Sequence, residues 1–436
     1  MSPAAAPDYE QPPISYSTTR PHDPATALKE AIDAGDVKLS HDGERGYLDA
    51  LLRELKISPS SQTLVFSKTS FQRDRISPQK PRALYFNDDT YVGYVPGGDV
   101  IEVASTDPKL GTIFYTVPQS ADATAATMPP KSRFIRETDN CLQCHGESMT
   151  RDIPGLLVRS VFADSTGEAI LSAGTFLTTH ESPLKERWGG WYVTGTTGAN
   201  EPHMGNTRWQ PTDTAGELPK PIAASNVAAA ASNQIPADVD IKQYLTRHSD
   251  VVALMVLEHQ VEAHNRITRA VHGTLRALRD EKIMADALGE PLRAGVHSDS
   301  TLSRIKSSCE PLVEYLLLSN EAPLTAPITG SSDFTADFSA RGPRDSQGRS
   351  LRDFDLKTRV FRYPCSYLIY SRSIEELPGP AKEYLNRRLW EILTAKDATK
   401  PYAHLTTADR AAIMQILRDT KPDVRDAWNA LEKGKR

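Results

Sequence analysis

The sequence predicts an α+β fold, with a β-rich N-terminal half and a helical C-terminal half. Between residues 62 and 117, short runs rich in β-branched and aromatic residues alternate with turn sequences. Beyond residue 240, apolar residues recur at helical spacing over several long segments. The chain has 436 residues, of which 39% are hydrophobic. This is enough to bury a core in about two or three domains, so global disorder is excluded.

Local signals predict the N-terminal elements. Residues 1–20 begin with a stretch rich in Pro and Ala, and we expect them to form a flexible arm. A helix is expected over 24–35, because Pro24 suits a first helical position and Gly35 suits a C-terminal stop. A second helix is expected over 44–57, where leucines recur at helical spacing.

The β-rich region is expected to extend over residues 21–210. Turn residues such as PGGD separate the runs TLVFS, RALYF, TYVGYV, VIEVAS and TIFYTV, which predicts an antiparallel meander. A hairpin follows, in which LLVRSVFA and AILSAGTFLT flank the turn DSTGE, and GGWYVTG forms a later strand or tight loop. Residues 211–239 are rich in Ala, Pro and Ser and are expected to be a long loop or linker.

The C-terminal region, residues 240–436, is expected to be helical and to pack on the β-rich region. Thr406 and Asp409 resemble a capping box, although Glu or Gln is the usual residue three positions after the cap. Helices are expected over 240–282, 300–319, 379–396, 406–419 and 422–433.

Charge and hydropathy exclude two classes of partner. The net charge is −5, and Lys and Arg are dispersed among Asp and Glu, so no basic patch for nucleic acid is expected. The longest uninterrupted apolar run covers 251–257, whereas a transmembrane helix needs about 20 residues. No transmembrane segment is therefore expected. The N-terminus as written also lacks the basic and apolar stretches of a secretory signal.

One short motif carries chemistry. Residues 141–145 read Cys-Leu-Gln-Cys-His, the CxxCH arrangement of covalent c-type haem attachment. Two intervening residues place both sulfurs at one edge of a porphyrin, where they form thioethers, and the adjacent histidine lies under the iron. We therefore expect one covalent haem c, with Cys141 and Cys144 as anchors and His145 as the proximal axial ligand.

Two other chemistries use the same cysteine spacing. A redox-active CxxC would end a strand and open a helix in a βαβ unit, but this motif follows a polar loop. A zinc site needs two more ligands, and the remaining cysteines, Cys309 and Cys365, have none nearby. Those two cysteines either form a disulfide in an oxidising compartment or remain inert buried thiols. Because haem c is assembled outside the cytoplasm, we expect a periplasmic or otherwise exported protein whose N-terminus is trimmed or mis-started.

The second axial ligand would decide the activity. The segment DVVALMVLEHQVEAHNRITRA is apolar on two helical faces and is therefore expected to be buried. Its polar residues, among them Glu258, His259 and His264, then need an iron, a propionate or one another as partners. His259 and His264 are candidate distal ligands, and Met204 and His203 in a loop compete with them.

The segment Arg187-Trp188-Gly189-Gly190-Trp191 fits a haem pocket. Paired glycines allow a flat ligand to approach the backbone, Trp188 and Trp191 would wall the porphyrin, and Arg187 would pair with a propionate. Core aromatic residues at the corner of a β-domain explain the same sequence equally well.

The motif resembles the c-type cytochrome superfamily, and the wider chain resembles a large family of bacterial monohaem c-type proteins. The second resemblance rests on LVFSKTSFQRDRISPQKPRALYFNDDTYVGYV, ETDNCLQCHGESMTRDIPGLLVRSV, RWGGWYVTG, HMGN, MVLEHQVEAHN and PCSYLIYS. It implies haem binding and electron transfer. In small cytochromes c, helices follow the motif, whereas strands and turns are expected here after His145, so the fold is not that of a simple small cytochrome c.

We therefore expect an exported haem c protein that transfers electrons and has a redox partner protein. The first alternative is a haem-dependent redox enzyme, peroxidase-like or oxygenase-like, with Glu258, His259 or His264 as distal acid/base groups over an open iron. The second alternative is a haem-based sensor.

Overall fold

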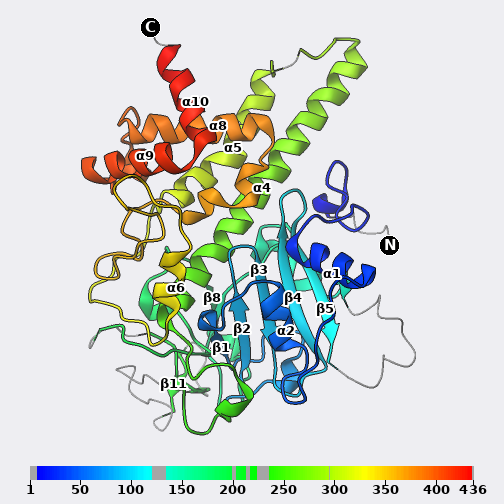
Figure 1. The fold of residues 1–436 in the computed structure, drawn as a ribbon, viewed down its shortest axis with the longest axis vertical. Coiled ribbons are helices and arrows are strands. Elements are labelled where there is room, and N and C mark those ends of the chain that lie inside the picture. Colours follow the sequence, from blue (N-terminus) through cyan, green and yellow to red (C-terminus); the bar gives the residue numbers. More distant parts are fainter. Residues whose placement is uncertain are drawn as a thin grey trace.

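A seven-stranded antiparallel sheet and a helical C-terminal half make up the fold in the computed structural model (Figure 1). The structure describes residues 7–119, 134–198, 203–212, 217–222, 235–293 and 295–434. Helices dominate after residue 250 and strands before it. The predicted α+β class is confirmed.

The predicted meander forms the centre of the sheet, whose strand order is β6-β5-β4-β3-β2-β1-β9. The strands are β1 (Thr63–Val65), β2 (Arg82–Phe86), β3 (Thr90–Tyr94), β4 (Val100–Asp107), β5 (Gly111–Pro118), β6 (Ile135–Glu137) and β9 (Trp191–Tyr192). The predicted hairpin is the pair β7 (Arg159–Val161) and β8 (Thr175–Leu177), and β10 (Trp209–Gln210) pairs with β11 (Lys220–Pro221). The GGWYVTG segment supplies β9, which pairs with β1.

Different helices cover the two faces of this sheet. Successive strand residues point to opposite faces, so Tyr115 faces away from the row that contains Tyr91 and Phe114. The Tyr115 hydroxyl donates to Asp23 (2.7 Å), the N-cap of α1 (Pro24–Ala34). The Tyr91 hydroxyl lies 3.0 Å from Nδ1 of His264 in α4 (Val251–Leu288). Helix α1 therefore packs on one face and α4 on the other.

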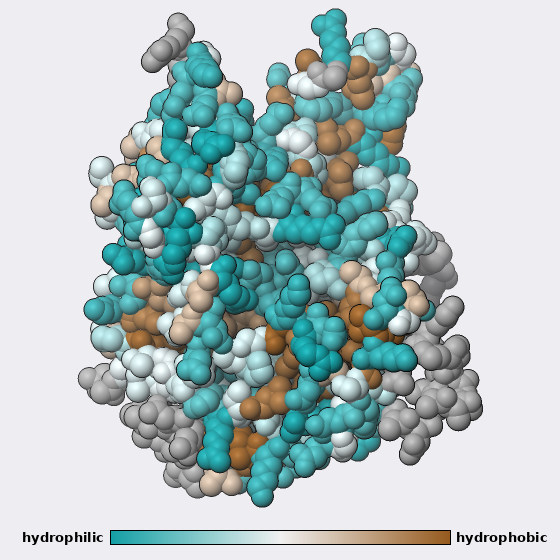
Figure 2. All heavy atoms as spheres, viewed as in Figure 1, coloured by the Kyte–Doolittle hydropathy of each residue, from teal (hydrophilic) through white to brown (hydrophobic). Residues whose placement is uncertain are grey.

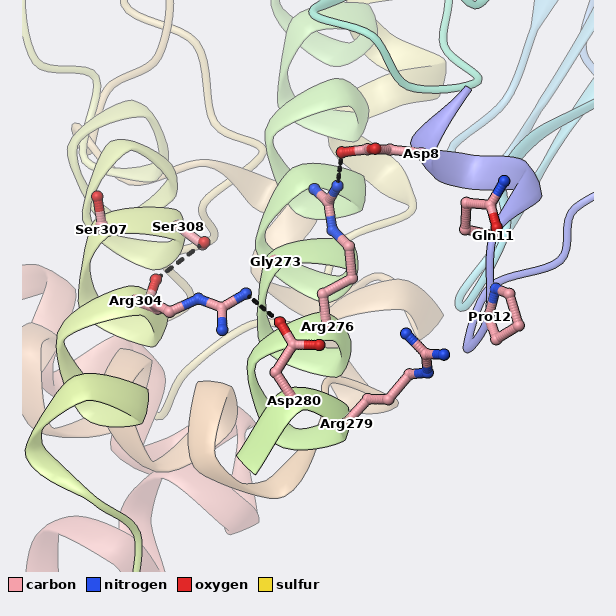
Figure 3. A pocket seen from close by; sticks show the side chains of 10 residues that line it. All are labelled: Asp8, Gln11, Pro12, Gly273, Arg276, Arg279, Asp280, Arg304, Ser307 and Ser308. Atoms are coloured by element: carbon pink, nitrogen blue, oxygen red, sulfur yellow. Dashed lines mark hydrogen bonds and ion pairs between the residues drawn. The ribbon is translucent and has the colours of Figure 1, made fainter. Parts of the chain in front are cut away.

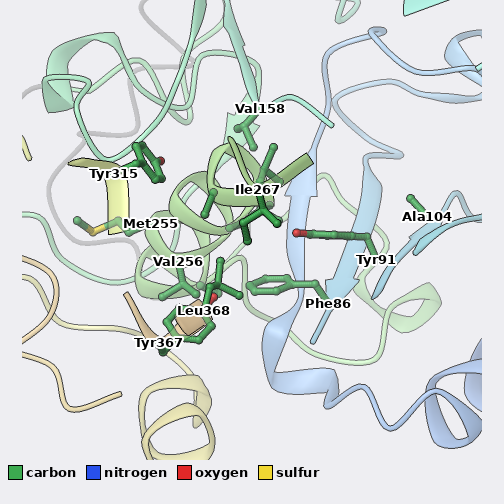
Figure 4. Close-up of a cluster of buried hydrophobic side chains, with 14 of the residues drawn as sticks. Phe86, Tyr91, Ala104, Val158, Met255, Val256, Ile267, Tyr315, Tyr367 and Leu368 are labelled. Atoms are coloured by element: carbon green, nitrogen blue, oxygen red, sulfur yellow. The ribbon is translucent and has the colours of Figure 1, made fainter. Parts of the chain in front are cut away.

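Helix α4 is the central element of the core. All residues from 251 to 265 are buried, as the apolar residues on two helical faces predict. Figure 4 shows Phe86 and Tyr91 reaching from the sheet toward this helix. The helix begins later than predicted, because the Asp250 carboxylate accepts hydrogen bonds from the first free N–H groups. It ends later than predicted, at a left-handed Gly289 (φ 69°).

The remaining helices follow the predicted order. The capping box at the start of α9 is present, because the Thr406 hydroxyl accepts from the Asp409 N–H (3.0 Å) and the Asp409 carboxylate accepts from the Thr406 N–H (3.1 Å). Two short helices, α6 (Phe334–Ala340) and α7 (Arg372–Glu375), were not predicted. The others are α2 (Leu48–Glu54), α3 (Leu142–His145), α5 (Asp299–Leu316), α8 (Gly379–Leu393), α9 (Thr407–Thr420) and α10 (Pro422–Lys433).

The N-terminal segment is packed from residue 8 onward, so the prediction of a flexible arm is wrong for residues 8–20. A short 3₁₀ turn, η1 (Asp8–Glu10), starts it, and Tyr9, Ile14 and Tyr16 are buried in the core. The Tyr16 hydroxyl also donates to the Thr112 carbonyl (2.9 Å). Burial of these three apolar side chains outweighs the disorder that the Pro and Ala content suggests.

Two further predictions are the linker at residues 211–239 and the absence of a transmembrane segment. Most of the predicted linker, residues 211–239, lies outside the described ranges. Among the helices of those ranges, none combines the length and the apolar run that crossing a bilayer requires.

Candidate functional site

The CxxCH motif forms a single helical turn that follows the edge strand β6. Within α3 and the residue before it, the His145 N–H donates to the Cys141 carbonyl (2.9 Å). Both thiols and the imidazole therefore project from one turn, as thioether attachment requires. Cys141 is half-buried against the core, Cys144 is exposed, and neither forms a disulfide.

One hydrogen bond fixes the tautomer of His145. Its Nδ1 lies 3.0 Å from the Gly155 carbonyl oxygen, which only accepts, so Nδ1 carries the proton. Burial lowers the pKa of His145 to about 4, so the ring is neutral near pH 7. The lone pair then lies on Nε2, which makes no hydrogen bond with any described residue. This is the tautomer in which a histidine binds a metal through Nε2, with the other nitrogen bonded to a carbonyl.

A short loop ties this histidine to α4. The Gly155 N–H donates back to the His145 carbonyl (2.9 Å), so hydrogen bonds close the loop between these two residues. The next residue, Leu156, is held by Asn265 of α4, which accepts from its N–H (3.1 Å) and donates to its carbonyl (2.7 Å). A Cβ on residue 155 would lie 2.4 Å from the Asn265 oxygen, so this position requires glycine.

The loop is also fixed at its tip and on its sheet side. Arg151 has a left-handed backbone (φ 62°), and its guanidinium pairs with Glu262 of α4 (2.9 Å). The Thr112 N–H of β5 donates to the Pro154 carbonyl (3.0 Å). On the same strand, the ring of Phe114 lies 5.0 Å from the ring of His145. Helix α4 and strand β5 therefore hold the loop between them.

The packed N-terminal segment covers the other side of the turn. A Cβ on Gly146 would lie 2.5 Å from the Tyr9 hydroxyl, so the tyrosine sits directly on the backbone after His145. An Asp8–Arg276 ion pair joins η1 to α4 (Figure 3). An open cavity of about 500 Å³ lies beside this pair. It is lined by Asp8, Gln11, Pro12, Gly273, Arg276, Arg279, Asp280, Arg304, Ser307 and Ser308.

Two of the predicted distal groups have partners in the core. Glu258 accepts from Arg187 at 2.9 Å, and both side chains are at most 2% exposed. His259 lies between His180, at 2.8 Å from Nδ1 to Nδ1, and the Ser366 hydroxyl, at 2.7 Å from its Nε2. Glu258 and His259 therefore lie on α4 one to two turns before Glu262 and Asn265, the two residues that hold the CxxCH loop.

The Ser319 carbonyl at the end of the His180–His259 network determines which ring nitrogens carry protons. The Nε2 of His180 lies 3.4 Å from the Ser319 carbonyl, so that nitrogen carries the proton and the Nδ1 of His180 accepts. His259 therefore donates through Nδ1, and its Nε2 accepts from Ser366. Both ring nitrogens of His259 are used within the protein. Burial lowers the pKa of His259 to about 3, which keeps the pair neutral.

The other distal candidates are buried as well. His264 contacts Tyr91 and Thr106 through Nδ1, at 3.0 and 3.2 Å. The sulfur of Met204 accepts from the Ser160 hydroxyl at 3.5 Å. His203 is buried, and its ring lies 5.2 Å from the ring of Trp188. In the described part of the chain, the hydrogen bonds of His264 and Met204 go to residues outside the CxxCH turn.

The RWGGW segment belongs to the core around Glu258. Arg187 is 1% exposed and also donates to the Ser182 carbonyl (2.8 Å), so protein groups occupy donors that were predicted to bind a propionate. Trp188 is fully buried with φ 67°, and Trp191 donates to the Arg159 carbonyl (2.8 Å). These contacts fit the alternative in which the tryptophans are core residues.

Cys309 and Cys365 are both buried and unpaired with each other. The sulfur of Cys309 lies 3.9 Å from the Thr274 hydroxyl of α4. Burial raises the pKa of both thiols, of Cys309 to about 11 and of Cys365 to about 12. The structure therefore agrees with two inert thiols rather than a disulfide.

The residues that orient His145 were not predicted as site residues. Gly155 and Asn265 are 10 and 120 positions away, and neither belongs to the CxxCH spacing. Asn265 was among the polar residues that interrupt the buried helix, and that interruption is the signal from which it could have been found. His180 and Ser366, which complete the network around His259, gave no such signal.

Comparison with known proteins gives no family, because no protein-family model, curated protein or solved structure matches the chain. In the described ranges, no three His, Cys, Asp or Glu side chains gather closely enough to hold a metal ion. The additional ligands of a zinc site are thus not found beside Cys141 and Cys144 there. The function has to be inferred from the geometry of the CxxCH turn.

Proposed function

We propose that this chain is an exported electron-transfer protein that carries one covalent haem c on Cys141, Cys144 and His145. The observation that carries the proposal is the hydrogen bond from Nδ1 of His145 to the Gly155 carbonyl, on the same turn as two free thiols. It presents Nε2 as the ligand atom. The bound haem supplies a one-electron redox centre.

The protein residues divide the work of holding that group. Cys141 and Cys144 fix it covalently, and His145 is its proximal ligand. The Gly155 carbonyl fixes the ring orientation of His145 and raises the basicity of its Nε2, as such partners do at metal sites. Asn265 holds the Gly155–Leu156 backbone and acts through it as a positioning residue.

The exposure of the turn suggests where a partner docks. Cys144 is exposed and Cys141 is half-buried, so one edge of the attached group would face solvent. A redox partner protein that contacts this edge would exchange electrons over a short distance.

The two alternatives have less support. A peroxidase-like or oxygenase-like enzyme needs a free acid/base group above the iron, but Glu258 and His259 are bonded to Arg187, His180 and Ser366. The third candidate, His264, is buried and uses its Nδ1 toward Tyr91 and Thr106. No observation among the described residues favours a haem-based sensor. We therefore place electron transfer first.

Expression with a c-haem maturation system tests the proposal. We expect the peptide containing residues 141–145 to carry the mass of a covalently attached haem. We also expect the Cys141→Ser, Cys144→Ser double variant to carry none, while the matched Cys309→Ser variant carries haem normally. Unmodified wild-type peptide would contradict haem attachment.

Spectra of the holoprotein separate the activities. A low-spin, six-coordinate iron that does not respond to CO or peroxide is expected for an electron carrier. High-spin iron that binds CO readily would contradict the carrier and support the enzyme or the sensor.

A further inference from the structure

The tip of the α4–α5 hairpin exposes a concentrated set of apolar side chains. Six of the eleven exposed large hydrophobic residues in the described part of the chain lie between residues 283 and 302. They are Ile283, Met284, Leu288, Leu292, Val296 and Leu302, and each is between 47% and 62% exposed. Figure 2 shows hydrophobic side chains on the upper right prong, where Figure 1 draws this hairpin. Exposed apolar patches of this kind mark interaction sites.

The hairpin presents this patch on a rigid support. Helix α4 has 38 residues, so it is about 57 Å long at 1.5 Å per residue, and its last turns extend beyond the body (Figure 1). A Cβ on Gly273 would lie 2.1 Å from the Ser308 hydroxyl, so α4 and α5 are in close contact at the base of the hairpin. Two antiparallel helices cannot bury their outer faces against each other. Two further helices would complete a four-helix arrangement that buries them.

The charges around the patch favour a second copy over a lipid surface. Residues 279–306 contain no Trp, Tyr or Phe and carry equal numbers of opposite charges. An interfacial helix is rich in Lys or Arg and carries aromatic anchors. A two-fold interface places the same surface on both sides, so a neutral surface of mixed charge complements itself. The charges are those of Arg279, Lys282, Arg293, Arg304 and Lys306 against Asp280, Glu281, Asp286, Glu290 and Asp299.

We propose that two copies of this chain associate through their hairpin tips, residues 279–293 and 295–306, into a two-fold dimer. Met284, Leu288 and Leu302 form the apolar centre. The ion pair between Arg304 and Asp280, which also line the cavity beside Arg276, lies at the rim of this interface. Asn265, which holds the CxxCH loop, is 14 residues before Arg279, about 21 Å along the helix. The dimer therefore leaves the exposed edge at Cys144 free.

The molar mass of the purified full chain in solution tests the dimer. One chain has a mass of 48.0 kDa, and we expect light scattering to give twice that value, falling toward one chain on dilution. The Met284→Lys, Leu288→Lys double variant is expected to be monomeric at every concentration. The matched control, Leu171→Lys with Leu218→Lys, changes two residues that are 73% and 66% exposed elsewhere, and it is expected to remain dimeric.

Three outcomes would overturn the proposal. The first is wild-type protein that stays monomeric at its highest soluble concentration. The second is a dimer that survives the double variant. The third is sedimentation with phosphatidylcholine vesicles that the double variant abolishes, which would assign the patch to a lipid surface. A second variant, Val296→Asp, lies outside both helices and should also give monomers with an unchanged circular dichroism spectrum, so misfolding of the helices cannot explain the result.

Discussion

Two polar clusters lie on the same buried helix, and they differ in what they leave free. Near the start of α4, one carboxylate oxygen of Glu258 pairs with Arg187, and both ring nitrogens of His259 are bonded to buried protein groups. Further along the same helix, Asn265 holds a loop that fixes one nitrogen of His145 and leaves the other nitrogen free. Both clusters contain histidines whose pKa burial lowers. The difference teaches that two histidines of one chain can differ in what they offer: His259 uses both ring nitrogens within the protein, whereas His145 keeps its Nε2 available.

The largest expected effect is in the buried cluster around Glu258 and His259. Arg187→Ala removes the partner of Glu258, and an uncompensated buried charge costs about 3–5 kcal/mol in the free energy of unfolding. The matched control is Arg151→Ala, whose side chain is 44% exposed in its pair with Glu262, and it should cost at most about 1 kcal/mol. Denaturant unfolding measures both values. Equal losses would remove the distinction between the two clusters.

Acid should lower the free energy of unfolding through His264, which is buried where α4 packs on the sheet. Burial lowers the pKa of His264 to about 4, so below pH 6.5 the unfolded chain takes up a proton that the folded chain does not. The free energy of unfolding therefore falls as the pH drops from 6.5 toward 4, by about 2 kcal/mol at pH 5 for this histidine. In His264→Gln, the difference in stability between pH 7 and pH 5 should shrink by about that amount. An unchanged difference would show that His264 titrates normally in the folded protein.

A smaller effect is expected where α4 holds the CxxCH loop. Asn265→Ala leaves the N–H and carbonyl of Leu156 without their partner, and such a loss costs about 1–3 kcal/mol. Asn429→Ala, on α10, is the control, and a change of less than about 0.5 kcal/mol is expected there. In the holoprotein, Asn265→Ala should also broaden the low-spin EPR signal, because the ring of His145 would be less well oriented. A sharp, unshifted signal would show that Asn265 does not position His145.

The smallest effect concerns the two buried cysteines. Because Cys309 and Cys365 are free thiols, a reductant should not change the unfolding midpoint of the protein. A native disulfide typically contributes about 2–5 kcal/mol, so its presence would be obvious as a drop in stability. Thiol titration of the denatured, unreduced holoprotein should find both groups.

The sequence predicts most of the strands and helices because their signals are local. The runs at 82–86 and 90–95 are bounded by turn residues, and β2 and β3 lie there almost residue for residue. The start of α4 was missed although Asp250 is a good N-cap residue, because residues 240–250 also carry apolar side chains. The packing of Tyr9 and Tyr16 depends on a surface that the rest of the chain creates, and no local pattern reports it.

The candidate site could be predicted only in part. Spacing alone identifies Cys141, Cys144 and His145. The partner of His145 is a backbone carbonyl, which every residue type offers, so the residue type at position 155 does not identify the acceptor. Glu258 and His259 have the residue types of distal acid/base groups, but their roles depend on His180 and Arg187, which lie about 70 to 80 positions away.

The double hydrogen bond between His145 and Gly155 also limits how the motif can be transplanted. A graft of residues 141–145 into another scaffold would carry the sulfurs and the imidazole but not the groups that choose the tautomer. The smallest portable unit extends to Leu156 and needs an amide side chain at the place of Asn265.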